Sequence, residues 1–169
     1  MKEFIIDTNV PKVSVGHPRL SKTCSNACVD FLNKVMNNSY LLVIDDSYHI
    51  LNEYMHNIDK SGAANHANRF LKWVLTNQRN TRRIKQIHIN QDGNSKSFSE
   101  VPEELRDIGF DPSDHKFIAV AIANDYSAPI IQASDSKWIG WKPSLIACKI
   151  QVIFPCEDEL TGIYKGKIC

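Results

Sequence analysis

Four acidic residues stand where an enzyme of the α/β class would place groups that do chemistry. Asp7 follows directly on a short apolar run, Asp135 follows another run after three residues, and Glu53 and Asp114 fall near the starts of segments with helical periodicity. Carboxylates gathered at one place repel one another unless a cation neutralises them. Hard divalent cations such as Mg²⁺ and Mn²⁺ prefer oxygen ligands, and such a site can activate water for attack on a phosphodiester. The four residues therefore indicate metal-dependent phosphodiester hydrolysis.

Each acid also has an ordinary structural role open to it. Asp7 and Asp135 are common residue types in turns after strands. Asp114 is a favourable charge at a helix N-terminus, and Glu53 alone would be a solvated helix residue. Joint placement decides between the two interpretations. In a parallel sheet all strands end at one edge and the following helices begin there, so this edge would collect the acids.

Unbroken apolar runs predict strands buried on both faces, which is typical of a parallel sheet. Phe4-Ile5-Ile6 is the clearest, and Tyr40 to Ile44 repeats the pattern after a helix capped by Ser21. The order strand, helix, strand, helix predicts an α/β fold with helical crossovers. We expect strands at 4–6, 40–44, 84–89, 129–131 and 150–154. We expect helices at 21–36, from 45–47 to a stop at Gly62, at 63–77 with Leu75 inward, at 102–105, from a cap at Ser113 to 122, and at 144–148, with loops at 11–20 and 91–99.

Length and composition limit the alternatives. At 169 residues the chain is expected to form a single domain, with 43% hydrophobic and 23% charged residues as in an ordinary globular protein. Its formal net charge of +1 excludes an overall basic field, so any nucleic-acid surface must be local. No apolar run approaches the ~20 residues of a membrane span, and the N-terminus lacks the pattern of a signal peptide. We therefore expect a cytoplasmic protein without a membrane segment.

The five cysteines form an odd and scattered set. Cys24 and Cys28 lie one helical turn apart, without a second pair at the spacing of a zinc site. We expect reduced thiols that mostly pack as small apolar groups.

Basic and aromatic residues offer places for a nucleic-acid strand. Arg79, Arg82 and Arg83 crowd one polar stretch, which is either a solvated turn or a phosphate-binding patch. Lys116 and Lys137 stand beside two of the acids. Trp138 and Trp141 follow Asp135, where they either stack on exposed bases or pack a helix against the sheet.

In their order along the chain, the acids and their neighbours resemble the PIN domain family, a nuclease fold. The matching segments are Phe4-Ile5-Ile6-Asp7-Thr8-Asn9, Ile50-Leu51-Asn52-Glu53, Asp114-His115-Lys116-Phe117-Ile118-Ala119-Val120-Ala121 and Ile130-Ile131-Gln132-Ala133-Ser134-Asp135-Ser136-Lys137-Trp138. Each segment is short and degenerate. The specificity therefore lies in the ordered set, which spans nearly the whole chain.

The resemblance implies a three-layer α/β/α sandwich with a central, mainly parallel sheet of about five strands. It also implies an endoribonuclease that uses Mg²⁺ or Mn²⁺, held by Asp7, Glu53, Asp114 and Asp135. In such a hydrolase Asn9 or Ser134 would orient a water or a ligand oxygen, and the basic residues named above would bind the RNA backbone. Small nucleases of this family act as toxins held by an antitoxin, in defence or in RNA processing, and they often form homodimers.

Several positions depart from the family pattern. Ala133 stands where the family often has Thr or Ser, Lys137 stands where it often has another acid, and Trp138 replaces a more usual Phe. Asp111 is a rival for the third acidic position. The segment at about 62–102 is longer than in compact toxins, so substrate choice or partner binding would differ there. A second hypothesis follows: a catalytically impaired PIN-like module that binds RNA or a protein partner.

Two other classes that use a strand-end aspartate fit less well. A phosphatase with an aspartyl nucleophile would usually carry a second Asp where Asn9 stands. A phosphoacceptor signalling domain would normally show an acidic pair before its strand-end Asp, and the chain has none there. The sequence leaves open whether RNA or DNA is cut, and whether one metal ion or two would be bound.

Overall fold

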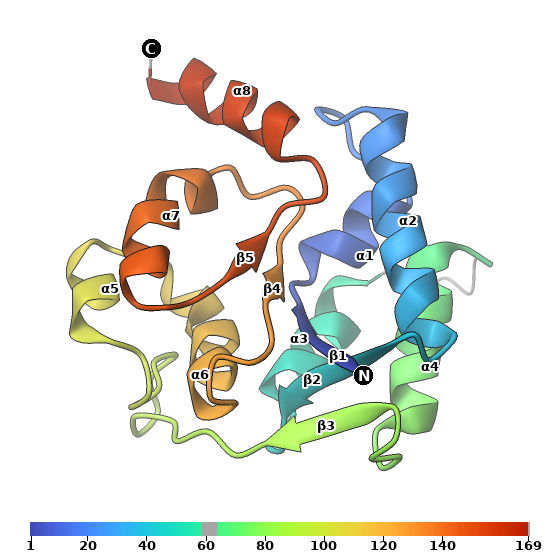
Figure 1. Cartoon of the computed structure of the whole chain (residues 1–169), viewed down its shortest axis with the longest axis horizontal. Coiled ribbons are helices and arrows are strands. Elements are labelled where there is room, and N and C mark those ends of the chain that lie inside the picture. Colours follow the sequence, from blue (N-terminus) through green and yellow to red (C-terminus); the bar gives the residue numbers. More distant parts are fainter. Residues whose placement is uncertain (59–63, 169) are drawn as a thin grey trace.

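A five-stranded sheet forms the centre of the computed structural model, which describes residues 1–58 and 64–168 (Figure 1). All four strand pairings are parallel, in the order β3-β2-β1-β4-β5. The strands are β1 (Lys2–Ile6), β2 (Tyr40–Asp45), β3 (Ile84–Ile87), β4 (Ile130–Ile131) and β5 (Val152–Ile153). The predicted α/β class with a parallel sheet of five strands is therefore confirmed.

Helices cover both faces of this sheet and complete three layers. They are α1 (Asn9–Ser14), α2 (Lys22–Met36), α3 (His49–Asn57), α4 (His66–Asn77), α5 (Glu103–Asp107), the 3₁₀ turn η1 (Pro112–Asp114), α6 (His115–Ala123), α7 (Lys137–Ala147) and α8 (Glu157–Ile168). In Figure 1, α1, α2 and α4 lie together on one side of the strands, and α5, α6 and α7 lie together on the other. Right-handed crossovers between parallel strands produce this division.

The central strands are apolar because both of their faces are covered. Ile5 and Ile6 of β1 and Val43 of β2 have no exposed surface. Side chains of this kind gain about 1.5–3 kcal/mol each from full burial. The runs that predicted strands from sequence are thus the middle layer of the sandwich.

The strand order creates a switch point beside β1. The chain moves from β1 outward to β2 and β3, and then returns to place β4 on the other side of β1. The Asp7 amide donates to the Ile131 carbonyl at 2.9 Å, which joins the carboxyl ends of the two strands. Open α/β sheets bind their ligands at such a point. The turn that follows β1 and the turn that follows β4 are therefore held side by side there.

Three local predictions are wrong. Residues 11–20 were expected to form a loop, but only 15–20 do so, because α1 (Asn9–Ser14) takes in the first four; Pro11 is tolerated there because it occupies the first turn. Ser113 was expected to cap a helix, but Asp111 is the cap and accepts hydrogen bonds from the Ser113 amide and hydroxyl at 2.9 and 2.8 Å. Leu75 was expected to point inward but is 39% exposed.

Other helix boundaries in the structure differ from those predicted from the sequence. The helix expected at 144–148 begins seven residues earlier, at Lys137. Helix α8 was not predicted at all, because its sequence carries little apolar periodicity. The helix stop expected at Gly62 lies outside the described residues, and α3 ends at Asn57.

A disulfide corrects the expectation of reduced thiols for one pair. Cys24 of α2 and Cys156, just before α8, are bonded with their Cα atoms 5.5 Å apart. The same junction is closed by Glu159, whose carboxylate accepts from the Ser21 amide at 2.8 Å and from the Ser21 hydroxyl at 2.6 Å. Cys28 remains a buried thiol, and burial raises its pKa to about 12. The first turn of α8 is thus fastened to the start of α2.

Asp45 shows how a strand-end carboxylate can be purely structural. It is fully buried, and its two oxygens accept from the His49 and Ile50 amides at 2.7 and 2.8 Å, which fixes the start of α3. One of the acids at 45–46 was expected to cap this helix, and Asp45 does so. The neighbouring Asp46 is exposed, and its carboxylate pairs with His88 at 2.9 Å and accepts from the Ser47 hydroxyl at 3.1 Å.

We predict that Asp45→Ala lowers the free energy of unfolding by about 2–3 kcal/mol, because two buried amides lose their acceptor. Urea unfolding followed by circular dichroism measures this change. Asp46→Ala is the matched control and should shift stability by less than about 0.5 kcal/mol. Equal losses in the two variants would contradict the capping role of Asp45.

No helix within residues 1–58 and 64–168 has both the length and the apolar character needed to cross a membrane.

Candidate active site

Asp7 is the innermost acid of the site. It ends β1, is 2% exposed, and accepts a hydrogen bond from the Asn9 amide at 2.8 Å. Burial raises the pKa of its carboxyl well above the usual value, and the nearby charges of Asp114 and Glu53 raise it further. The Asn9 hydrogen bond opposes this rise without overcoming it. Asp7 therefore helps to fix the start of α1, and its charged form is destabilised at the switch point by burial and by the neighbouring acids.

Asp114 is the acid that the fold brings toward Asp7. It stands between η1 and α6, and its Oδ2 atom accepts from the indole N–H of Trp138 at 3.1 Å. Burial raises its pKa to about 6, although the Trp138 hydrogen bond and the charge of Lys116 both act to lower it. Asp111, the rival for this position, is used as the cap of η1, and those hydrogen bonds lower its pKa. The geometry favours Asp114 over Asp111 as the third acid.

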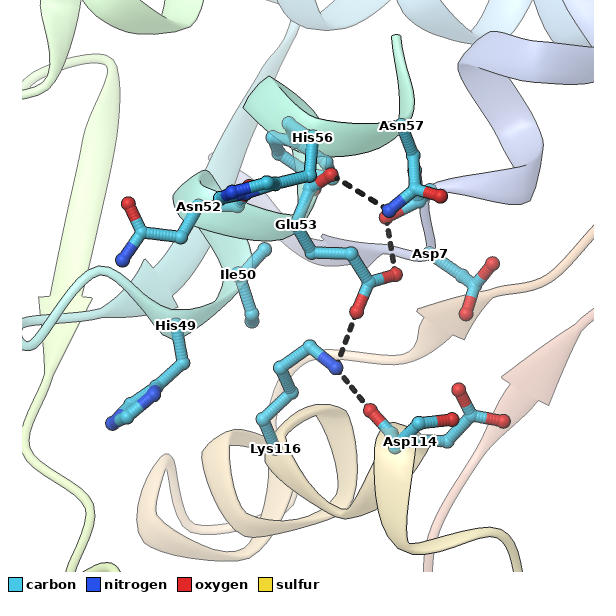
Figure 2. Close-up of polar contacts among 12 residues, drawn as sticks. Asp7, His49, Ile50, Asn52, Glu53, His56, Asn57, Asp114 and Lys116 are labelled. Carbon is cyan, nitrogen blue, oxygen red and sulfur yellow. Dashed lines mark hydrogen bonds and ion pairs between the residues drawn. The ribbon is translucent and has the colours of Figure 1, made fainter. Parts of the chain in front are cut away.

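Glu53 is held from two sides, as Figure 2 shows. Its Oε1 atom accepts from the Thr8 hydroxyl at 2.6 Å, and its Oε2 atom forms an ion pair with the ammonium of Lys116. The Lys116 ammonium also donates to the Ser113 carbonyl. With only 11% of its side chain exposed, Lys116 is a nearly buried cation placed among acids. It supplies part of the positive charge that this cluster requires.

Asp135 follows β4 and is half-buried. Its Oδ1 atom accepts from the Lys137 amide at 3.0 Å, so it caps the start of α7. The turn that carries it is organised by Gln132, whose side-chain oxygen accepts from the amides of Ser134 and Asp135 at 2.9 and 3.1 Å. The Asn9 side chain reaches the same oxygen at 3.5 Å. Asn9 and Ser134 thus lie where the β1 and β4 turns meet.

Gln132 was not identified from the sequence. It is completely buried, and its Nε2 atom has no hydrogen-bond partner among the described residues. The available clue was a polar residue directly after Ile130-Ile131, where the apolar run could have continued.

The acids are neighbours but do not form a closed ligand set. The charge of Asp114 acts on Asp7, and the charge of Asp135 acts on Asp114. Within residues 1–58 and 64–168, however, no three His, Cys, Asp or Glu side chains converge as they would around a metal ion. The arrangement is a buried Asp7 with a half-buried Asp114 nearby, flanked by Glu53 with its lysine and by Asp135 with its helix cap.

The proposed nucleic-acid-binding residues divide into two groups. Lys116 and Lys137 lie beside the acids. Arg79, Arg82 and Arg83 precede β3, and the Arg83 carbonyl accepts from the Leu42 amide near the amino ends of the strands. These three arginines therefore lie at the amino ends of the strands, whereas Asp7 lies at the carboxyl ends. They do not join the acids in one site.

Of the two roles open to the tryptophans, packing is the one observed for Trp138. Its side chain has no exposed surface and meets the Phe110 ring at a centroid distance of 5.0 Å. Trp141 is half-buried and contacts the same ring at 4.6 Å. The hypothesis that Trp138 stacks on RNA bases is therefore wrong, because no face of its ring is free.

A cavity of about 590 Å³ adjoins the Glu53–Lys116 ion pair, and we call it the polar cavity because most of the residues that line it are of polar or charged types. Besides Glu53, three further residues of α3 line it, namely His49, Asn52 and His56. Lys96 and Phe98 of the loop after β3 form part of the opposite wall. Sequence reasoning did not single out these residues, although positions 49, 52 and 56 share one helix face by their spacing.

Stability of the metal-free protein should depend on Asp114 between about pH 4 and pH 6. An aspartate titrates near 3.8 in the unfolded chain, whereas the pKa of Asp114 in the fold is about 6. Over this interval the native state binds more protons than the unfolded state, so the free energy of unfolding falls as pH rises. A shift of about two pKa units corresponds to about 3 kcal/mol, and solvent contact reduces this to about 1–3 kcal/mol.

The measurement is the unfolding free energy at several pH values in EDTA, for the wild-type protein and for Asp114→Asn. The difference between them removes the carboxyls whose pKa values are lowered, such as Glu3 and Glu159, and reports Asp114 together with its effect on Asp7. The free energy of unfolding of Asp114→Asn, relative to that of the wild type, should increase steadily from pH 4 to pH 6. A constant difference across this range would contradict the raised pKa.

Comparisons of the chain with protein-family models, with curated proteins and with solved structures found no match. The function must therefore be inferred from the residues of the site.

Proposed function

We propose that this chain is a PIN-like, metal-dependent endoribonuclease that hydrolyses phosphodiester bonds. One observation carries the proposal: Asp7 and Asp114, 107 positions apart in the sequence, both have raised pKa values, and Asp114 lies near enough to the switch point of the parallel sheet for its charge to act on Asp7. A fold does not keep two partly buried carboxylates together for stability, because their repulsion and desolvation act against it. Such a pair is typical of functional sites.

The donor set fits a hard divalent cation, Mg²⁺ or Mn²⁺. Asp7, Asp114, Glu53 and Asp135 are the residues that would hold it. The buried and mutually repelling charges of the first two are the features that a cation would relieve. When bound, the cation would lower the pKa of a water and balance the charge that develops on the phosphate.

The other residues of the site hold this arrangement. Gln132 fixes the turn of Ser134 and Asp135, and Asn9 bonds to the same amide oxygen. Asn9 and Ser134 are placed to orient a water or a phosphate oxygen. Lys137, exposed at the start of α7, is placed to meet a backbone phosphate, which would make RNA binding sensitive to salt.

A second candidate is a PIN-like module that binds RNA or a protein partner without cutting. The Glu53–Lys116 ion pair favours it, because one of the four acids is already neutralised. Ala133 and Lys137 favour it as well, since neither can add an oxygen ligand. In either form we propose a toxin with an antitoxin partner, a defence factor or an RNA-processing factor, which forms a homodimer as PIN proteins often do. The Cys24–Cys156 disulfide is unusual for a cytoplasmic protein, so the location expected from the sequence is not part of this proposal.

The test is incubation of a mixed-sequence single-stranded RNA with the purified protein and Mn²⁺ or Mg²⁺, with EDTA as the control. Cleavage that requires the metal supports the nuclease. RNA that is bound but left intact, at protein concentrations well above the dissociation constant, would overturn it in favour of the non-catalytic module. A DNA strand of the same sequence tests whether ribose is required.

A further inference from the structure

We propose that the polar cavity beside the Glu53–Lys116 ion pair binds one unstacked nucleotide of the RNA strand, next to the phosphate at the acidic site. This inference rests on the proposed function, and it goes beyond it by naming where the strand is recognised. Glu53 and Lys116 belong to both places, because they line the cavity and also contact the acidic cluster.

The positions of the side chains separate the two halves of the site. In Figure 2, His49 and Asn52 extend to one side of the Glu53–Lys116 pair, whereas Asp7 and Asp114 lie on its other side. A strand whose phosphate lies at the acids would therefore place an adjoining nucleotide over the ion pair and into the cavity. Lys116 stands at the boundary, where it is suited to meet the phosphate between the two.

The lining has the chemistry of a nucleotide site. Lys96 and Lys116 contribute ammonium groups for a phosphate, and the amide of Asn52 can pair with a base edge. Imidazole rings such as those of His49 and His56 are suited to stacking on a base. A cavity of about 590 Å³ is within the range of small-ligand sites. A double helix would not fit this role, because its bases are stacked and their edges paired.

The two histidine rings are already oriented. His56 bonds through Nδ1 to the Asn52 carbonyl at 2.6 Å, so its Nε2 atom is left for a ligand. The His49 and Phe98 rings meet edge to face at a centroid distance of 5.1 Å. Fixing such groups before binding lowers the entropic cost of association.

The loop that forms the far wall is also anchored. Ser97 bonds to His115 of α6 at 3.0 Å, and Asp92 pairs with Arg106 of α5 at 3.1 Å. Gln91 and Phe98 form an antiparallel bridge. The wall is therefore built as a fixed surface, and it comes from the segment at 62–102 in which the chain departs from the compact PIN pattern.

The experiment measures binding without cleavage. Asp7→Asn is the parent protein, EDTA is present, and the probe is a short fluorescent single-stranded RNA followed by anisotropy. His56→Ala, Asn52→Ala and Lys96→Ala are added singly to the parent. Each should weaken RNA binding about tenfold, as expected for the loss of one polar or charged contact.

Matched controls are available on remote surfaces. Asn26→Ala on α2 matches Asn52→Ala, since both asparagines are exposed and helical, and Lys72→Ala on α4 matches Lys96→Ala as an exposed lysine. The controls should bind within about twofold of the parent. Salt titration separates the charge of Lys96 from the uncharged contact of Asn52, because only the lysine variant should flatten the salt dependence.

The outcomes separate the two proposals. If the cavity variants bind RNA as tightly as the parent, or if the parent binds no RNA, the cavity is not a nucleotide site, whatever the wild-type protein cleaves. If the cavity variants lose binding but the wild-type protein cuts no RNA with Mn²⁺, the cavity inference stands and the nuclease proposal fails. Equal weakening by cavity and control variants would mean a diffuse charge effect and would overturn the inference.

Discussion

Replacing Asp7 by asparagine is expected to lower metal-dependent RNA cleavage by about 10²–10³-fold without damage to the fold. The amide oxygen of asparagine can still accept the 2.8 Å hydrogen bond from the Asn9 amide, so the start of α1 is preserved. Only the charge is lost, and this charge is the one that a divalent cation would require. Initial rates at saturating Mn²⁺, wild type beside variant, give the size of the effect.

The same substitution should raise stability in the absence of metal. Because burial and the neighbouring acids raise the pKa of Asp7, its charged form disfavours the native state above the pKa of an unfolded aspartate. Asp7→Asn removes this penalty, so its melting temperature in EDTA at pH 7 should exceed that of the wild type. Asp46→Asn, at an exposed strand-end acid, is the control and should change neither rate nor stability.

The cleavage rate and the melting temperature of Asp7→Asn serve as controls for each other. Cleavage that survives Asp7→Asn would point to a contaminating nuclease and would remove the support for this site. A variant that loses cleavage and is also much less stable would show that Asp7 serves mainly as a structural cap.

Those parts of the fold that depend on local pattern were predictable from the sequence. The run from Phe4 to Ile6 is apolar throughout because both faces of β1 are covered, and this signal survives without knowledge of the neighbours. Contacts between distant segments were not predictable. The Cys24–Cys156 disulfide joins residues 132 positions apart, and the sequence around either cysteine does not indicate which cysteine it bonds to. Helix α1 was missed because Pro11 reads as a loop residue unless the helix start at Asn9 is known.

The site shows the same division. The acids were found because strand ends and helix starts can be located along the chain, and their edge follows from a parallel sheet. The role of Lys116 could not be found this way, because its ammonium meets Glu53 only when α6 packs beside α3. The arginines at 79–83 were equally conspicuous in the sequence. They precede β3, however, so the direction of this strand places them at the amino ends of the strands, away from the acids.

Replacing Lys116 by methionine should lower the free energy of unfolding in EDTA by about 2–4 kcal/mol. Methionine keeps most of the volume of the stem, but Glu53 loses its only cationic partner among the described residues, and Asp7 and Asp114 lose a nearby positive charge. Removing one partner of a largely buried ion pair leaves an uncompensated charge, which is a large effect for one residue. Chemical unfolding of the variant beside Lys137→Met, an exposed lysine of the same site, isolates the buried charge.

Mn²⁺ should then separate two interpretations of this loss. If the acids form a cation site, the metal replaces the missing ammonium, and it should raise the melting temperature of Lys116→Met more than that of the wild type. If Lys116 serves only to balance Glu53, Mn²⁺ should stabilise the two proteins equally.

The double variant Glu53→Gln/Lys116→Met tests whether Lys116 stabilises the fold through its ion pair with Glu53. It removes both charges of the pair, so it should recover much of the stability that Lys116→Met loses, as coupled neighbours do. Its Mn²⁺ response should be weaker than that of Lys116→Met, because an acid that flanks the metal position is gone. A double variant as unstable as Lys116→Met would mean that the lysine stabilises the fold through its contacts with Ser113 and the Phe117 ring and not through Glu53. In that case the lysine would be no substitute for a metal ion, and the acids would have to be balanced in another way.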